Sequence, residues 1–234
     1  QGITLPLNHG VYRLVGVGND YEKTEVYNVD CGEMTNINFR HPDCLNREVE
    51  GNDSLYLGSK LIDIDANEVY FRDTVRFYSS HLKVSYTVKD YVNPNAKPGA
   101  SALANNDGYL DLRVKNLKHR TAFDQAHDKN LAEGEKVVYS PELKWNTENG
   151  DHEAYFHIMR HPADSDVEFE LIDRATGSVV HTLKLADLLA GFTFALDVTK
   201  QEVLIPIEIY FKSVGVYVTI AGWDVNDVYP VPGY

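Results

Sequence analysis

The sequence has few cysteines and tryptophans, fewer basic than acidic residues, and no long apolar run. Its 234 residues include two Cys and two Trp, and 22 Lys and Arg stand against 35 Asp and Glu, which gives a formal net charge of −13. Nucleic acids and anionic lipids are bound through clustered Lys and Arg, so this balance excludes a general binder of either. No segment approaches the roughly 18 apolar residues with which a helix spans a bilayer.

The two thiols are too few for a zinc site built from cysteines. Cys31 and Cys44 are the only cysteines and form no CxxC pattern. Two alternatives stay open for them: a disulfide that closes a polar loop in an oxidising compartment, or two free buried thiols. The chain begins at Gln1 without a signal-like segment, so we expect any signal peptide or lipid-anchor cysteine to lie upstream.

Alternation of apolar and polar residues predicts an all-β protein. In His81–Lys89, the side chains of Leu82, Val84, Tyr86 and Val88 fall on one face, as in a half-buried antiparallel strand. The same alternation, regular or partial, marks further predicted strands at Val11–Val17, Lys60–Ile64, Thr74–Tyr78, Tyr109–Lys115, Ala154–Met159, Val167–Leu171 and Val179–Leu185. Many short strands separated by Gly, Pro, Asn and Asp predict a β-sandwich.

Two late segments and one helix complete the pattern. Val203–Phe211 and Val214–Ala221 are apolar on both faces, which is typical of central strands, although Pro206 indicates an edge or a bulge. Leu185–Gly191 (LADLLAG) is the single predicted helix, about two turns long and ended by its glycine.

Two breaks in composition bear on domain organisation. Residues 93–108 are rich in Pro, Ala, Asn and Gly and form either a linker or a long loop within one sheet. Pro141–Gly150 separates a polar stretch from a new run of strands. We place the boundary there and predict two β-sandwich domains, 1–142 and 143–234, of which the second carries 14 acidic and 6 basic residues.

No motif in the sequence predicts catalysis. The pair His152 and His157 resembles a zinc-protease motif, but its spacing is one residue too long and a strand would point the two rings to opposite faces. Asp63–Glu68 lacks the glycine of an EF-hand loop, so only a calcium site of another kind, between sandwich loops, stays open as a minor alternative. We therefore predict no enzyme, no catalytic residue, no cofactor and no metal.

The order of several blocks resembles the FimB-type fimbrial-subunit family of Bacteroidales, which is part of the fimbrillin superfamily. The blocks are LNHGVYRLVGVGN, then DSLYLGSKLIDID and TVRFYSSHLKVSYTV, then LRVKNLKHRTAFD with VVYSP. They are followed by AYFHIMRH, DVEFELIDRATGSVVHTLKLADLLAG, QEVLIPIEIYF and VYVTIAGWDV. Each motif is short, and it is their order over most of the chain that carries the resemblance.

The resemblance implies two tandem transthyretin-like β-sandwiches, exported, often lipid-anchored, and built into surface fimbriae at the outer membrane. Its partners would be other fimbrial subunits, joined by β-strand addition. The chain starts beyond the family's first strand, so we expect a strand-acceptor site near the residues Val11, Leu14, Val15 and Val17. Any contact with the membrane would run through the upstream lipid anchor alone.

Two further expectations follow from the resemblance. A shaft subunit would offer a long C-terminal donor strand, but Asn226–Tyr234 carries Pro230 and Pro232, which lack the backbone N–H groups that such a strand donates. We therefore predict a terminal subunit, anchor or tip. Ser54 and Thr74 fit the loose O-glycosylation triplet of this bacterial group.

A carbohydrate-binding sandwich is the alternative function. The chain holds fifteen tyrosines, and tyrosine is enriched in recognition surfaces, although it is also a good β former. In this alternative, an exposed Tyr or Trp223 would stack on sugars, and the partner would be a host or bacterial surface glycan or protein.

Overall fold

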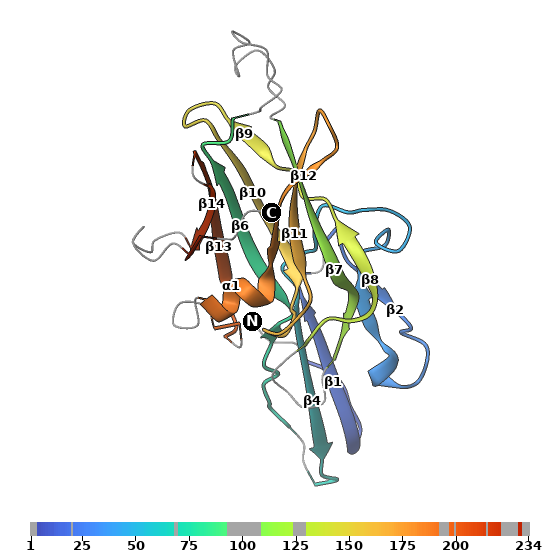
Figure 1. Ribbon diagram of the computed structural model, residues 1–234. Helices are drawn as coiled ribbons and strands as arrows, with labels where there is room; N and C mark the ends of the chain where they lie inside the picture. Colours follow the sequence, from blue (N-terminus) through green and yellow to red (C-terminus); the bar gives the residue numbers. More distant parts are fainter. Residues whose placement is uncertain are drawn as a thin grey trace.

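The computed structural model of the protein describes residues 4–19, 21–67, 70–92, 109–123, 130–191, 197–198, 200–213, 215–220 and 229–230. Within these residues the chain forms fifteen strands, one α-helix and one short 3₁₀ turn, Met34–Asn36 (Figure 1). The predicted all-β class is confirmed. So is the helix, since α1 spans Leu185–Gly191 and buries three leucines against the strands.

Two sheets form a sandwich. The first has the order β15–β14–β13–β6–β10–β9, with bounds Tyr229–Pro230, Gly215–Ile220, Leu204–Lys212, His81–Lys89, Asp151–Met159 and Lys144–Asn146. The second has the order β12–β11–β7–β3–β2, with bounds Val179–Lys184, Glu168–Asp173, Leu110–Ala122, Asn38–Arg40 and Glu25–Tyr27, and β8 (Glu133–Tyr139) also pairs with β7. Their inner faces share one apolar core, in which the rings of Tyr86 and Phe169 stack with centroids 5.8 Å apart.

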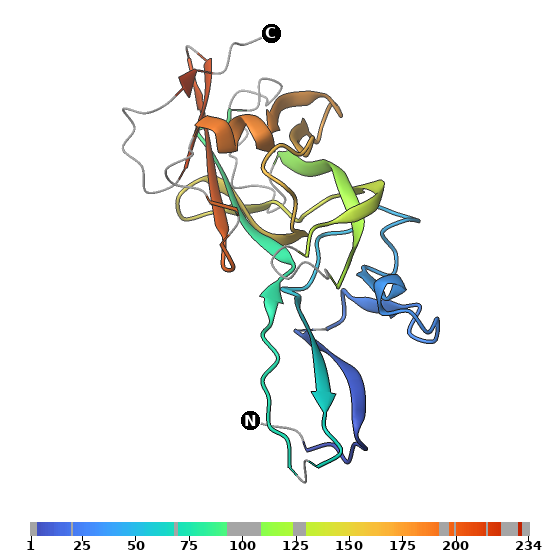
Figure 2. The same ribbon diagram turned by 90° about the horizontal axis from the view of Figure 1, so that it is seen from below.

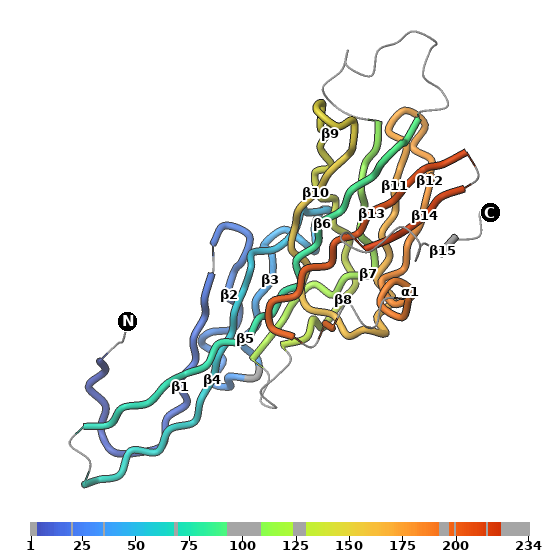
Figure 3. The backbone as a smooth tube through the Cα atoms, turned by 90° about the vertical axis from the view of Figure 1, so that its left-hand side faces the viewer, coloured from blue at the N-terminus to red at the C-terminus, as the bar shows by residue number. Residues whose placement is uncertain are grey.

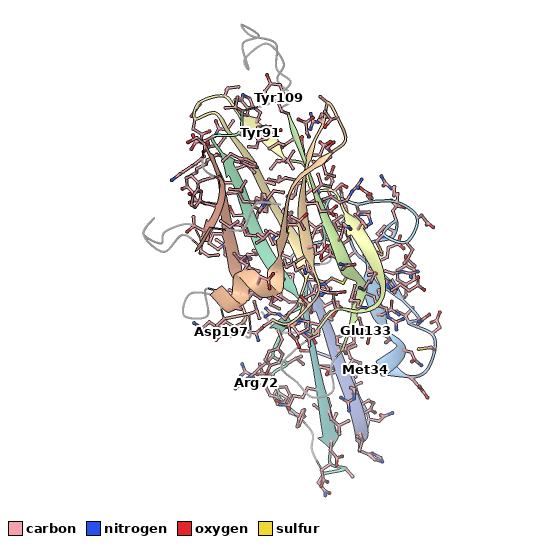
Figure 4. All side chains as sticks on the ribbon, viewed as in Figure 1. Met34, Arg72, Tyr91, Tyr109, Glu133 and Asp197 are labelled. Atoms are coloured by element: carbon pink, nitrogen blue, oxygen red, sulfur yellow. The ribbon has the colours of Figure 1, made fainter. Side chains whose placement is uncertain are left out.

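A third, smaller sheet projects from one end of the sandwich. It has the order β1 (Gly10–Gly18), β4 (Tyr56–Ile64) and β5 (Tyr78–Ser79). Figures 2 and 3 show it extending away from the two larger sheets, while Tyr91 and Tyr109 lie at the opposite end of the sandwich (Figure 4). A small separate core lies at its root and is built from Phe39, Leu55, Leu57 and Phe123.

The predicted boundary between residues 142 and 143 is wrong. β6 comes before this boundary in the chain, but in the sheet it lies between β10 and β13, which both come after the boundary. Tyr86 of β6 is paired with Ala154 of β10 on one side and with Ile207 of β13 on the other. Half of the chain cannot complete this sheet, and the loop at residues 147–150 only joins the hairpin of β9 and β10. The three strands of the small sheet all precede Ser80, but β2 and β3 also precede it and belong to the second large sheet, so no single boundary in the chain separates the sheets.

Three local predictions also differ from the structure. The strand predicted at Thr74–Tyr78 is reduced to β5, because the residues before Tyr78 run over the small sheet without pairing. The strand predicted at Tyr109–Lys115 is longer in the structure, because β7 continues through the basic residues 116–120 to Ala122. Pro206 lies inside β13, between β6 and β14, but outside the described pairing with β14, which begins at Ile207.

One buried arginine joins the small sheet to the sandwich. Arg160 follows β10 directly, is 3% exposed, and donates hydrogen bonds to five backbone carbonyl groups, those of Ser79, His81, Val198, Lys200 and Gln201. A buried guanidinium is tolerated only when its donors are satisfied in this way. The Arg160 backbone N–H also bonds to Ser80 O, so the chain is fixed at the point where it passes from β5 to β6.

Two buried tyrosines differ in whether their hydroxyl groups have a hydrogen-bond partner. The Tyr86 hydroxyl has no hydrogen-bond partner in the described core, whereas the Tyr139 hydroxyl exchanges two hydrogen bonds with Asn52, of 2.7 and 3.0 Å. Removing an unpaired buried hydroxyl relieves a desolvation cost, while removing a paired one leaves its partner unsatisfied. Tyr86→Phe is expected to raise the unfolding free energy by about 1 kcal/mol and Tyr139→Phe to lower it by about 1–3 kcal/mol, measured by urea unfolding. Equal losses in both variants would contradict this assignment.

Buried histidines predict a loss of stability in mild acid. Burial lowers the pKa of His81, His152 and His161 from 6.5 to about 4. Between pH 6.5 and 4 the unfolded chain binds more protons than the folded one, so the unfolding free energy falls as the pH falls through this window. Urea unfolding at pH 7 and pH 5 checks it: a drop of at least about 2 kcal/mol is expected, which His161→Gln reduces and the exposed control His9→Gln does not. A stability that is constant over this range would refute the assignment.

Candidate strand-acceptor site

The site predicted around Val11–Val17 lies on β1, an outer strand of the projecting sheet. β1 pairs antiparallel with β4 along all nine of its residues, from Gly10 opposite Ile64 to Gly18 opposite Tyr56. Its other edge has no partner strand in the part of the chain that the structure describes. An open strand edge presents a row of unpaired backbone N–H and C=O groups, which is a template for another strand.

One face of this sheet is apolar and uncovered. Val11, Val15 and Val17 point to it from β1 and are 64%, 43% and 37% exposed, and Leu61 of β4 is 57% exposed on the same face. We call this surface the open face. Three polar side chains interrupt this apolar surface: exposed Arg13 opposite Leu61, exposed Asp63 opposite Val11, and half-buried Ser59 opposite Val15. Contiguous exposed apolar side chains on a strand are unusual and mark interaction surfaces.

The opposite face is covered by a single extended segment, residues 70–77, which we call the strap. Leu14 points to this side, so the structure gathers three of the four predicted acceptor residues and separates the fourth. The strap approaches the sheet closely at two glycines. A Cβ on Gly58 would lie 2.4 Å from Arg76 O, and one on Gly16 would lie 2.6 Å from the Phe77 ring.

The strap itself has few attachments. Asp73 accepts hydrogen bonds from the Lys60 ammonium group and from the Thr74 backbone N–H, and these bonds, that from Lys60 most of all, lower the pKa of the Asp73 carboxyl. Tyr70 is 78% exposed, and Arg72 projects from the strap beside the small sheet (Figure 4). A segment that is held by so few buried contacts opens at a low free-energy cost.

The remaining predicted residues are spread over the molecule. Cys31 and Cys44 are free thiols in the structure, the first exposed and the second buried with its S–H 3.7 Å from His119 O, so no disulfide joins them. Burial raises the pKa of the Cys44 thiol. Thr74 is exposed on the strap, whereas Ser54 is half-buried and accepts a hydrogen bond from Asn19.

Among the described residues, no group of three or more His, Cys, Asp or Glu side chains is placed to hold a metal ion. The described helices also include none that is long and apolar enough to cross a bilayer. Trp223, the tryptophan named for sugar stacking, lies outside the described residues.

A comparison with models of protein families identifies the family of this chain. The model of the fimbrillin-A associated anchor proteins Mfa1 and Mfa2 matches residues 1–229. The chain belongs to the Mfa2 family. The predicted resemblance to fimbrial subunits of Bacteroidales is thereby confirmed, and the family gives the protein a structural role in fimbriae at the cell surface, together with other fimbrial subunits.

Solved structures share the fold of this Mfa2-family chain. A candidate polysaccharide-binding protein (DUF1812) from Bacteroides thetaiotaomicron is 15% identical, with a TM-score of 0.70 over 97% of this chain and 78% of its own. A candidate adhesin from the same organism is 16% identical, with a TM-score of 0.66 over 94% and 78%. The fimbrial anchor protein Mfa2 from Porphyromonas gingivalis is 12% identical, with a TM-score of 0.63 over 93% and 76%. Curated protein sequences gave no match.

The strap and the open face had only weak signals in the sequence. Gly16 lies inside the strand predicted at Val11–Val17, and a glycine inside a strand often marks the close approach of another backbone. Gly58 precedes the strand predicted at Lys60–Ile64 by two residues and falls inside β4 only in the structure. Leu61 is apolar on a face that also carries Asp63 and Ser59, so its strand gives no clear alternation. Which segment approaches the glycines depends on tertiary structure.

The contact at Gly58 predicts how the strap can be loosened. Gly58→Ala places a Cβ against the backbone of Arg76, which cannot rotate away, so the strap is expected to lift. Limited trypsin digestion should then cleave after Arg72 and Arg76 several times faster than in the parent protein. Gly191→Ala, whose Cβ would have no neighbour within 4 Å, is the control. Equal cleavage rates in the parent and Gly58→Ala would show that the strap does not depend on this contact.

Proposed function

We propose that this Mfa2-family chain is a terminal, anchoring subunit of a surface fimbria and that it accepts a strand from a neighbouring subunit on β1. The observation that carries the proposal is the combination of an unpaired edge and an uncovered apolar face on the same strand. An added strand would gain main-chain hydrogen bonds along β1, and its own side chains would pack beside the valines on the open face.

The apolar side chains of the open face supply a favourable term of useful size. Fully burying a valine or leucine side chain contributes roughly 1.5–3 kcal/mol, and Val11, Val15, Val17 and Leu61 are already partly covered. An added strand would lie beside the three valines of β1 and gain about 1 kcal/mol from each of them, while Leu61 lies on β4, beyond β1. Arg13 adds specificity, because a partner with an acidic side chain at the facing position would neutralise it.

The C-terminal strand supports a terminal position. β15 pairs antiparallel with β14 of the same chain, with Tyr229 opposite Val218 and Pro230 opposite Tyr217. A segment that is paired within its own sheet and contains a proline is poorly suited to be donated to a neighbour. Pro232 lies outside the described residues.

Attachment and modification belong to the same proposal. We infer that a lipid anchor upstream of Gln1 holds the protein at the outer membrane, with the fimbria growing from the acceptor strand. Of the two predicted glycosylation positions, exposed Thr74 fits better than half-buried Ser54. The intact mass of the natively expressed Thr74→Ala variant would test the modification.

A photo-crosslinking experiment tests the acceptor strand. A benzoylphenylalanine residue in place of Val15 is expected to crosslink to another fimbrial subunit in the native fimbriated host, identified by mass spectrometry, because Val15 lies on the open face. The same residue in place of Val179, exposed on edge strand β12, is the matched control and should give no such product. Crosslinks from position 179 and none from position 15 would overturn the proposal.

A further inference from the structure

An exposed tyrosine stands on the outer face of the sandwich, away from the acceptor strand. Tyr155 of β10 is 62% exposed. Across the sheet it is paired with Ser85 of β6, which in turn is paired with Pro206 of β13. Residues that are paired point to the same face, so Ser85 borders the tyrosine ring and Pro206 lies beyond Ser85. These two small side chains leave a flat shelf, and Lys83 of the same face lies close enough to Tyr155 for an electrostatic interaction.

A shallow cavity opens on the other side of the same ring. It has a volume of about 120 Å³ and is lined by Tyr155 together with Lys23, Glu50, Glu142 and His157. These residues come from four regions of the sequence: the segment before β2, the loop before β4, the connection between β8 and β9, and β10 itself. Gly51 closes the floor, since a Cβ there would lie 3.0 Å from His157 O.

The ring and the charges of this site are held in place by their neighbours. The His157 ring packs edge-on against Tyr155, with centroids 5.6 Å apart. Lys23 forms an ion pair with Glu50 at 3.5 Å, and Glu142 forms one with Lys144 at 3.0 Å. The rim therefore offers several hydrogen-bond donors and acceptors but no unpaired charge among these four residues.

We propose that Tyr155 and this cavity form a binding site for neutral pyranose sugars of a polysaccharide. The C–H face of a pyranose ring is apolar and stacks on an aromatic ring, while its hydroxyl groups need polar partners at the edge. Tyr155 supplies the ring, and Lys23, Glu50 and Glu142 supply the polar rim. The flat shelf over Ser85 and Pro206 leaves room for neighbouring sugar units of a longer chain.

The chemistry of the site argues for a neutral sugar rather than a charged one. Its acidic and basic side chains are already paired with each other, and an acidic sugar would also meet a chain of net charge −13. Tyrosine is suited to the role because it offers a large contact area at a small cost in side-chain entropy. The site goes beyond the anchoring function and does not depend on it, because it uses β10 rather than β1.

Affinity electrophoresis tests the site. The full chain is run in native gels that contain galactomannan or soluble starch, as plant polysaccharides, or gastric mucin, as a host glycan. Retardation is expected in at least one gel, and the gel that responds tells the two sources apart. Tyr155→Ala should weaken the apparent affinity at least fivefold, while Tyr155→Phe, which keeps the ring, should retain most of it. Tyr70→Ala, which removes an exposed tyrosine from the strap, is the matched control.

The expected results distinguish a loss of sugar binding from a loss of folding and from a failure of the anchoring proposal. The melting temperature of Tyr155→Ala should equal that of the parent, since the removed side chain is mostly exposed. No retardation of the parent chain in any of the three gels, or equal retardation of Tyr155→Ala, would overturn the sugar site. Neither result would bear on crosslinking through position 15, so the two proposals fail independently.

Discussion

The arrangement of the molecule depends on the hydrogen bonds of one buried arginine. The guanidinium group of Arg160 bonds to backbone carbonyls at the end of β5, the start of β6 and the loop before β13. It thereby ties together three segments that are remote in the sequence, at the point where the chain leaves the small sheet for the sandwich. A buried cation with so many carbonyl partners is costly to disturb, because each carbonyl would lose its partner along with it. The projecting sheet is therefore held in a fixed place.

This junction joins the sandwich, whose two sheets cover each other, to the small sheet, which has one uncovered face. The sandwich encloses a large apolar core between two sheets, whereas the core described at the root of the small sheet is a separate cluster of four buried residues. Beyond that root, one face of the sheet is covered by the strap and the other is open. A sandwich needs a second layer on each exposed apolar face. The missing layer explains why Val11, Val15 and Val17 are exposed. Under the proposed function, this is the side of the molecule on which another subunit would pack.

Sequence patterns predicted the positions of the strands more reliably than which strands pair with one another. Alternation located β1, β6, β7 and β10, and the LADLLAG segment located α1, because these signals are local. The domain boundary failed because β6 takes its partners from β10 and β13, a pairing that no local pattern records. The acceptor strand was predicted from the family resemblance. That Leu14 points to the strap while the three valines point to the open face follows from the strand geometry and its register with β4. Arg160 gave no signal, since its partners are backbone carbonyls and not side chains.

The central claim is that β1 is the edge on which a neighbouring subunit completes the small sheet. Cryo-electron microscopy of the native fimbrial base, with this chain in place, tests it most directly. The account predicts an additional strand, supplied by another chain, that is hydrogen-bonded along β1 and packs its side chains beside Val11, Val15 and Val17. A map in which the neighbouring subunit contacts only the sandwich, while the edge of β1 and its valines remain in solvent, would contradict it.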